Sequence, residues 1–297
     1  MITPEKLKKG DKIGIISTAR KISLEELDPA IKIIKSWSLQ VELGENIFKE
    51  DNQFSGSLTQ RALDLQTMID DKSIKAIFCA RGGYGTIQII DRVNFSKIIQ
   101  SPKWIIGYSD VTVLHSHLNT LRVPSLHASM PINFQENTRA AITSLKNVLF
   151  KTKNKIKTTS HFFNRPGKVS AEIVGGNLSI LYSLLGSSSD INTDGRILLI
   201  EDLDEYLYHI DRMMMSLKRN RKFENLKGMI VGGMSNMNDN DIPFGKTAEQ
   251  IILDYTKDYT FPICFRFPTG HLNDNRCVKF GVRSILEITE DGVSLSQ

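Results

Sequence analysis

Short apolar runs alternate with amphipathic helical patterns in the N-terminal part of the chain, and this alternation restricts the fold more than any other feature. The runs have the length and composition of buried strands, and the segments between them repeat apolar residues every three or four positions. The predicted strands are 12–17, 40–43, 74–80 and 104–106, and the predicted helices are 24–37 and 58–69. Strands separated by helices indicate an α/β fold with a mostly parallel sheet. Ligands of such sheets bind at the carboxyl ends of the strands.

The second half of the chain repeats this alternation after a polar, aperiodic stretch. We therefore predict a first domain at 1–150, a linker at 151–168 and a second α/β domain at 169–297. The predicted elements of the second domain are strands at 169–177, 195–200, 226–233, 262–267, 277–280 and 285–288, and helices at 178–185 and 207–217.

Composition excludes several classes of protein. With 40% hydrophobic and 24% charged residues, the 297-residue chain resembles a soluble globular protein, and its net charge of +5 is scattered rather than gathered into a nucleic-acid patch. No apolar run approaches the ~20 residues of a membrane span. The first ten residues lack the apolar core of a signal peptide. We expect a cytoplasmic protein that binds neither membranes nor nucleic acids.

Ser109 follows the strand at 104–106 and precedes Val111, Leu114 and Leu118, which share one helical face. A serine at a strand-to-helix turn presents its hydroxyl beside backbone N–H groups that lack intrahelical partners, as in a nucleophile elbow. Serine is also a common N-cap. The stretch alone therefore allows either a nucleophile or a cap.

Three glycines lie within residues 81–85, at the end of another strand. The loop fits neither nucleotide-binding glycine motif, so it is either an N–H donor to an oxyanion beside Ser109 or a plain tight turn. His115, His117 and His127 form a histidine-rich stretch, but no carboxylate at ligand spacing joins them, and a metal site is not favoured. The three cysteines contain no C-x-x-C pair and predict neither zinc nor disulfides.

Two further polar residues follow predicted strands of the second domain. Glu201 ends the strand at 195–200, and His271 comes directly after Gly270. A serine needs a base to take its proton, and the base needs an orienting carboxylate, so Ser109, Glu201 and His271 fit an order used by serine hydrolases. Singly, Glu201 also fits an N-cap or an ion pair, and His271 a structural loop residue.

Several motifs in order give the chain a resemblance to the LD-carboxypeptidase family of serine peptidases, which includes the microcin C self-immunity proteins. The motifs lie at 7–15, 81–85, 107–112, 174–178, 199–202, 210–213 and 270–271. The resemblance implies a flavodoxin-like N-terminal domain, a smaller C-terminal α/β domain and an active site in the cleft between them. It also implies a homodimer and no metal or cofactor.

By this resemblance, Ser109 is the nucleophile, His271 the general base and Glu201 its orienter. The oxyanion hole maps to the N–H groups of Gly83 and Asp110. The implied reaction releases terminal D-alanine from murein tetrapeptide by hydrolysis of an L,D-peptide bond. We expect a residue that binds the free carboxylate of the substrate, and a guanidinium suits that role. Arg81 is the candidate.

Two other functions remain as alternatives. An immunity-type enzyme would cleave aminoacyl-nucleotide analogues and would need an aromatic residue to stack on the base, usually a tryptophan from an insert. Trp37 and Trp104 both lie in predicted core segments, which favours the murein peptide as substrate. A non-catalytic flavodoxin-like module would bind a nucleotide or sugar phosphate. That function would leave Glu201 and His271 without a role.

Overall fold

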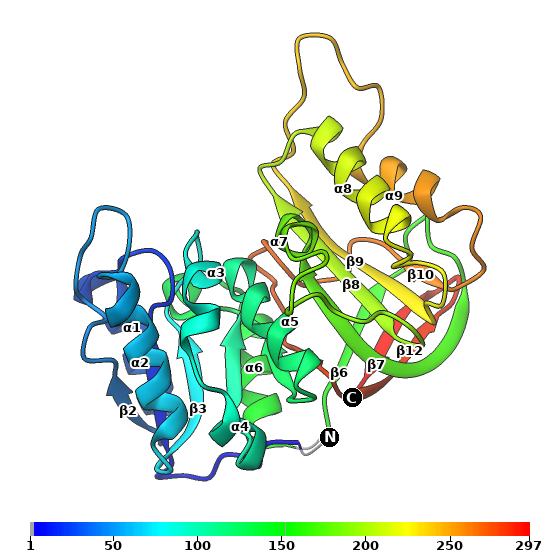
Figure 1. Ribbon diagram of the computed structural model, residues 1–297. Helices are drawn as coiled ribbons and strands as arrows, with labels where there is room; N and C mark the ends of the chain where they lie inside the picture. The colour runs from blue at the N-terminus through cyan, green and yellow to red at the C-terminus, as the bar shows by residue number, and fades with distance from the viewer. Residues whose placement is uncertain (1–2, 152) are drawn as a thin grey trace.

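The structure, a computed structural model, describes residues 3–151 and 153–297. Two sheets, each with its own helices, lie side by side in Figure 1. Residues 1–2 of the expected first domain and residue 152 of the expected linker lie outside the described residues. No helix in the described part of the chain is long and apolar enough to cross a membrane.

The first sheet has the strand order β11-β5-β4-β3-β1-β2. Its strands are β1 (Lys12–Ile16), β2 (Gln40–Leu43), β3 (Ile74–Cys79), β4 (Trp104–Gly107), β5 (Ser125–His127) and β11 (Val278–Phe280). Strands β2, β1, β3, β4 and β5 are parallel, and this order is that of flavodoxin-like folds. The flavodoxin-like fold is therefore confirmed. The order reverses between β1 and β3, which is where such sheets bind ligands.

Helices cover both faces of this sheet. They are α1 (Leu24–Ser36), α2 (Leu58–Asp70), α3 (Thr86–Ile89), α4 (Ser96–Gln100), α5 (Thr112–Thr120) and α6 (Arg139–Phe150), with 3-10 turns η1 (Ile90–Arg92), η2 (Ser109–Val111) and η3 (Pro131–Asn133). Helix α1 begins at Leu24 because Ser23 and Glu26 form a capping box, and Pro29 lies inside it.

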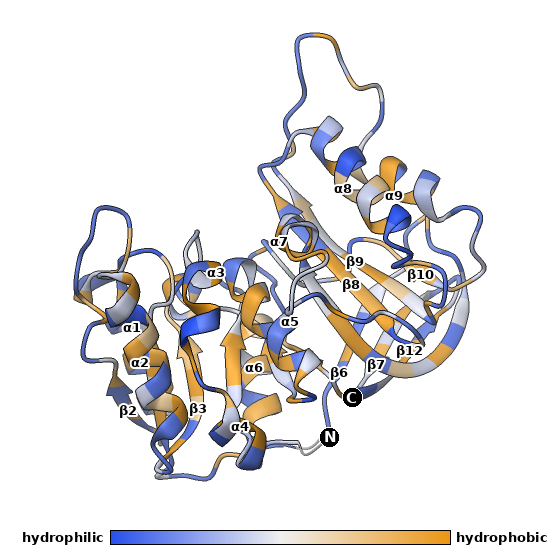
Figure 2. Ribbon diagram, viewed as in Figure 1, coloured by the Kyte–Doolittle hydropathy of each residue, from blue (hydrophilic) through white to orange (hydrophobic). Residues whose placement is uncertain are grey.

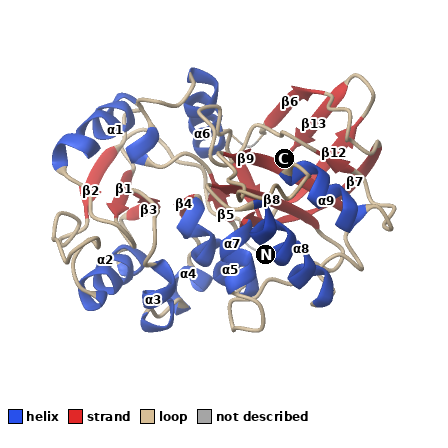
Figure 3. Ribbon diagram, turned by 90° about the horizontal axis from the view of Figure 1, so that it is seen from above, coloured by secondary structure: helices blue, strands red, loops and turns tan. Residues whose placement is uncertain are grey.

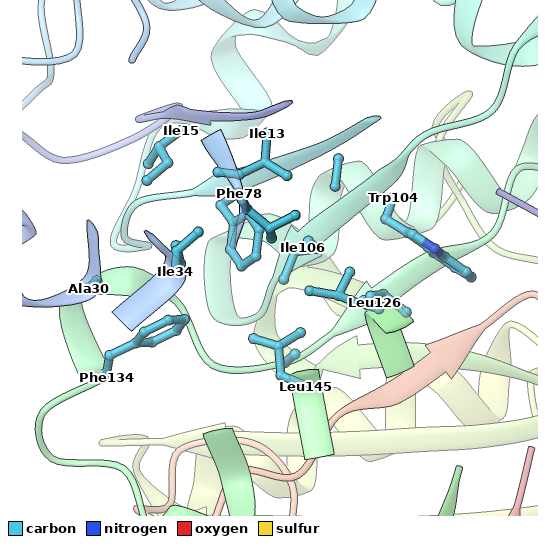
Figure 4. Close-up of a cluster of buried hydrophobic side chains, with 14 of the residues drawn as sticks. Ile13, Ile15, Ala30, Ile34, Phe78, Trp104, Ile106, Leu126, Phe134 and Leu145 are labelled. Carbon is cyan, nitrogen blue, oxygen red and sulfur yellow. The ribbon is translucent and has the colours of Figure 1, made fainter. Parts of the chain in front are cut away.

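The core beneath α1 and α6 shows how alternation along a strand builds a layer (Figure 4). Phe78 of β3 packs with Ile34 of α1 and Leu145 of α6, whereas its neighbours Ile77 and Cys79 belong to the core on the opposite face, beneath α2 and α5. Successive strand residues point to opposite faces, so an apolar run such as β3 supplies both cores.

The second sheet has the order β10-β9-β8-β7-β12-β13-β6. Its strands are β6 (Lys155–Thr159), β7 (Gly167–Asn177), β8 (Ile197–Leu203), β9 (Gly228–Ser235), β10 (Ile263–Cys264), β12 (Arg283–Ile288) and β13 (Gly292–Ser296). Strands β7 to β10 are parallel, and the remaining neighbours are antiparallel. The expected second α/β domain is thus present.

Three helices, α7 (Leu178–Ser183), α8 (Leu207–Arg219) and α9 (Ala248–Thr256), pack against the parallel strands of this sheet. Figure 2 shows these strands as mainly apolar. In α8, Met213 and Met214 are buried in the core, whereas Met215 is exposed.

Two segments differ from the predictions because distant pairing partners decided their structure. The expected linker 151–168 contains β6, a mostly polar strand that pairs with β13 and forms one edge of the second sheet. Of the strand expected at 277–280 in the second domain, Val278–Phe280 forms β11, which pairs with β5 at the edge of the first sheet. This crossover covers an edge whose backbone groups would otherwise lack partners. The domain boundary at 150 stays a prediction.

Side-chain hydrogen bonds also join the two sheets with their helices. Thr112 Oγ1 of α5 accepts a 2.9 Å hydrogen bond from the backbone N–H of Asn177, at the end of β7. Ser116 Oγ donates to the carbonyl of Ser189 at 2.5 Å. In the view from above, α5 lies beside α7 (Figure 3). Residues from both sheets can therefore contribute to one site.

Candidate active site

Ser109 lies in a strained turn at the carboxyl end of β4. Its backbone φ is +61°, a left-handed value that is uncommon for residues with a β-carbon. The capping positions of η2 and α5 are Tyr108 and Val111, so Ser109 is not an N-cap. A β-carbon on Gly82 would lie 3.2 Å from Ser109 Oγ, which shows how closely the glycine loop approaches the hydroxyl. The turn has the shape of a nucleophile elbow.

Glu201 and His271 are in direct contact. The Glu201 carboxylate, in the carboxyl-terminal half of β8, is fully buried, and its Oε2 accepts hydrogen bonds from Nδ1 of His271 at 2.6 Å and from the backbone N–H of His271 at 3.2 Å. Gly270 has a φ of +97°, and a β-carbon there would lie 2.6 Å from Glu201 Oε2. The nearby acid Glu205 pairs instead with His209.

This pairing sets the charge of both groups. Burial, the largest single effect, opposes ionisation of Glu201, but His271 and the hydrogen bonds outweigh it and hold the pKa of Glu201 well below its usual range. Burial also lowers the pKa of His271, but the charge and hydrogen bond of Glu201 outweigh it and raise that pKa above its ordinary value. Because Nδ1 faces a carboxylate, the proton of neutral His271 lies on Nδ1 and leaves Nε2 as the basic atom.

Tyr108 connects the serine turn to the histidine. Its ring centroid lies 4.8 Å from that of His271, and its hydroxyl donates to Asn133 Oδ1 at 3.0 Å. No hydrogen bond joins Ser109 Oγ to His271 in residues 3–151 and 153–297. Catalytic hydrogen bonds of free enzymes often shorten only when substrate binds.

The two predicted oxyanion donors lie on the loops that flank Ser109. Neither the backbone N–H of Gly83 nor that of Asp110 donates a hydrogen bond within the described part of the chain. Gly83 has a φ of +113°, which favours glycine. The buried Asp110 side chain accepts a 2.9 Å hydrogen bond from the N–H of Thr86, so it ties the serine turn to the start of α3.

One nitrogen of the Arg81 guanidinium already has partners. Its Nη1 donates to the carbonyl of Lys21 at 2.9 Å and lies 3.6 Å from Glu26 Oε1. Arg20, which follows β1, packs directly against the glycine loop, because a β-carbon on Gly83 would clash with its Cγ and Cδ. Arg20 is exposed, and its guanidinium makes no hydrogen bond or ion pair within the described residues. The sequence reasoning overlooked it.

Arg61 was also overlooked, although it shares the apolar helical face of Ala62 and Leu65. Its buried guanidinium donates from Nη1 to the carbonyls of Thr18 and Gly85, at 2.9 and 3.0 Å, and from Nη2 to Gln88. It therefore joins the loops after β1 and β3. An arginine on the apolar face of a predicted helix indicates a buried, hydrogen-bonded cation, and this pattern could have identified Arg61.

The three histidines of the sequence motif have separate environments. His115 hydrogen-bonds to Ser125 and to the carbonyl of Gly107, and burial lowers its pKa to about 3. Nδ1 of His117 is hydrogen-bonded to Oγ of Ser189, which lies between α7 and β8. His127 is buried beside Glu201. Among the described residues, no three His, Cys, Asp or Glu side chains are grouped so that they could hold a metal ion.

Comparisons with known proteins agree along almost the whole chain. Residues 13–128 match the family model of the LD-carboxypeptidase N-terminal domain, and residues 170–286 match that of the C-terminal domain. A probable murein peptide carboxypeptidase of Bacillus subtilis is 33% identical, with 97% of this chain and 92% of the relative aligned. A murein tetrapeptide carboxypeptidase of Pseudomonas aeruginosa is 23% identical, with 93% of each chain aligned.

Solved structures show the same fold. The muramoyltetrapeptide carboxypeptidase from Oxalobacter formigenes superposes with a TM-score of 0.89 at 22% identity, over 96% of this chain and 98% of that chain. MccF in complex with glutamyl sulfamoyl guanosine superposes with a TM-score of 0.87 at 20% identity, over 99% and 98% of the two chains.

Proposed function

The chain belongs to the LD-carboxypeptidase family and is a serine-type carboxypeptidase, and from this premise we propose that it releases terminal D-alanine from murein tetrapeptides by hydrolysing the L,D-peptide bond. The contact between Glu201 and His271, whose imidazole packs against Tyr108 beside the strained Ser109 turn, is the observation that carries the proposal. A fully buried carboxylate bonded to Nδ1 of an imidazole is the arrangement that orients a general base.

In the proposed mechanism, Ser109 Oγ attacks the carbonyl carbon of the L,D-peptide bond, and Nε2 of His271 takes the hydroxyl proton. The same nitrogen then gives this proton to the amine of the leaving D-alanine, and an acyl-enzyme ester on Ser109 remains. Water, deprotonated by His271, hydrolyses this ester and frees the serine. Glu201 stays ionised and stabilises the imidazolium that forms in both steps.

The N–H groups of Gly83 and Asp110 are the proposed oxyanion hole, because both are without partners in the described residues and belong to the loops beside Ser109. Loss of one such donor typically lowers turnover by ~10²–10³. The turn must therefore keep its left-handed backbone at Ser109 to aim the following N–H.

A carboxypeptidase must also bind a free terminal carboxylate, and we propose Arg81 for this contact. Its Nη1 already donates to Lys21, so Arg20 is the rival residue. Replacing each arginine separately by lysine and measuring the Michaelis constant separates the two. An unchanged Michaelis constant in Arg81→Lys, with a raised one in Arg20→Lys, would transfer the role to Arg20.

Burial of both tryptophans favours a murein peptide over an aminoacyl-nucleotide analogue. Trp37 and Trp104 belong to the core of the first sheet, so neither can stack on a nucleobase. The proposal also includes a cytoplasmic homodimer, as the family resemblance implies. Light scattering of the purified protein tests the dimer.

The decisive experiment measures D-alanine release from L-Ala-γ-D-Glu-meso-diaminopimelyl-D-Ala by the wild type and by Ser109→Ala. We expect release by the wild type and none above background by the variant. A folded wild type that releases no D-alanine would reject the murein substrate. Aminoacyl-nucleotide analogues, assayed in parallel with both proteins, would then show whether Ser109 acts on the alternative substrate.

A further inference from the structure

Glu201 has a second carboxylate oxygen that the pair with His271 does not use. This atom, Oε1, faces Nε2 of His127 at 3.8 Å. Both side chains are fully buried, and neither atom has a hydrogen-bond partner among the described residues. Two buried polar atoms without other partners are costly, and their position opposite each other needs an explanation.

The chemistry of the two atoms determines which one carries a proton. An ionised carboxylate can only accept a hydrogen bond, so a bare Nε2 would point its lone pair at a negative charge. Nδ1, the other ring nitrogen of His127, lies 3.1 Å from Thr269 Oγ1, which is the shortest side-chain contact of that hydroxyl. Thr269 can donate to Nδ1, which leaves the proton of the neutral ring on Nε2.

We propose that His127 is a positioning residue that holds Glu201 through an Nε2–H to Oε1 hydrogen bond, so that the acid lies between two histidines. This inference rests on the proposed function, because it assigns His127 a part in the same triad. A shift of about 0.9 Å brings the two atoms to an ordinary hydrogen-bond length of ~2.9 Å, and catalytic hydrogen bonds commonly shorten in this way when substrate binds.

The bond crosses from one sheet to the other. His127 is the last residue of β5 in the first sheet, whereas Glu201 lies within the carboxyl-terminal half of β8 in the second. His271 lies in the loop between β10 of the second sheet and β11 of the first, and its ring contacts Tyr108 beside Ser109. The hydrogen bond from His127 of β5 would fix Glu201, and through it His271, to the sheet that carries Ser109.

The histidine ring also packs, so the test must separate packing from hydrogen bonding. Its centroid lies 5.4 Å from that of Phe280 and 6.0 Å from that of Tyr108. His127→Phe keeps a ring and loses the donor, whereas His127→Gln keeps an N–H donor and loses the ring. His117→Phe is the matched control, because His117 is a partly buried histidine that contacts Ser189 and Phe95 rather than the triad.

We expect His127→Phe to lower kcat for D-alanine release by about 10- to 100-fold, the range for one hydrogen bond to a buried charge. KM should stay within about twofold, since His127 touches the acid and not the substrate. His127→Gln should recover kcat to within about fivefold of the wild type, and His117→Phe should match it. Wild-type kcat in His127→Phe, or equal losses in the Phe and Gln variants, would overturn the proposal.

A second measurement does not depend on activity. The ¹⁵N shifts of the imidazoles in the wild-type protein report which nitrogens are protonated, and His127→Gln identifies the signal. We expect a proton on Nε2 of His127; a bare Nε2 would refute the bond. Because this result does not depend on D-alanine release, the inference can fail while the proposed function stands, and the reverse.

Discussion

The substitution Gly270→Ala tests how the loop that precedes His271 positions the Glu201 side chain. A β-carbon at this position would lie 2.6 Å from Glu201 Oε2 and 2.7 Å from both Cβ and Cγ of Glu201. Rotation of the carboxylate cannot relieve the clash, because the near part of the Glu201 side chain is involved as well as its end. Gly270→Ala must therefore move the acid, the loop, or both.

The expected cost has two parts. A non-glycine residue at a φ of +97° costs about 1–2 kcal/mol in backbone strain, and overpacking adds about 1–3 kcal/mol. The free energy of unfolding should fall by about 2–5 kcal/mol. Catalysis should suffer more, because a displacement of about 1 Å in a catalytic group can cost ~10²-fold.

Gly10→Ala is the matched control. Gly10 has a φ of +89°, and a β-carbon there would meet nothing within 4 Å. It should show the backbone cost of about 1–2 kcal/mol alone and full activity. Urea unfolding and D-alanine release on all three proteins measure both effects. The reasoning is refuted if Gly270→Ala keeps activity within threefold of the wild type, or if Gly10→Ala loses as much.

Three further predictions concern charge and burial. Activity of the wild type should fall as the pH drops through the pKa of His271, which lies above 6.5, because only the neutral imidazole is a base. In Glu201→Gln the effect of burial on the pKa of His271 should dominate, so the acid limb of the residual kcat/KM profile should move to lower pH. An acid limb at the same pH as in the wild type would contradict the pairing. Arg61→Lys should lower the free energy of unfolding by about 1–3 kcal/mol, since one ammonium cannot replace the three hydrogen bonds of the guanidinium. Urea titration measures this change. A change under about 0.5 kcal/mol, the size of an ordinary surface substitution, would contradict the structural role of Arg61. Burial raises the pKa of each cysteine thiol, so Ellman's reagent at mildly alkaline pH should label none in the native protein and all in denaturant; native labelling would show that the cores open. These thiols are Cys79, Cys264 and Cys277.

Local pattern predicted most of the first sheet. The runs that form β1 and β3 are apolar apart from Lys12 and Lys75, because each face of a parallel sheet is covered by helices, and α2 follows its apolar spacing from Leu58 to Asp70. Helix α1 begins at Leu24, the first residue of its predicted range, where Ser23 and Glu26 form a capping box. These features depend on neighbours in sequence, so periodicity is enough to find them.

Long-range pairing was not visible in the same way. Strand β6 has a polar sequence and forms because β13 supplies its hydrogen bonds, and β11 leaves the second half of the chain to complete the edge beside β5. His127 looked like part of a histidine-rich stretch, and nothing near it in sequence indicates that Glu201 faces it. Such partners lie far apart along the chain, and only folding brings them together.

The sequence by itself determined the α/β class from periodicity. Its resemblance to the LD-carboxypeptidase family added the flavodoxin-like expectation and the three candidate residues Ser109, Glu201 and His271. The tertiary structure decided that Glu201 bonds His271, that Ser109 has a left-handed backbone and that Arg81 is held by Lys21. Periodicity reports which face of an element is buried. It carries no distance between side chains on different sheets, and the chemistry of this site depends on those distances.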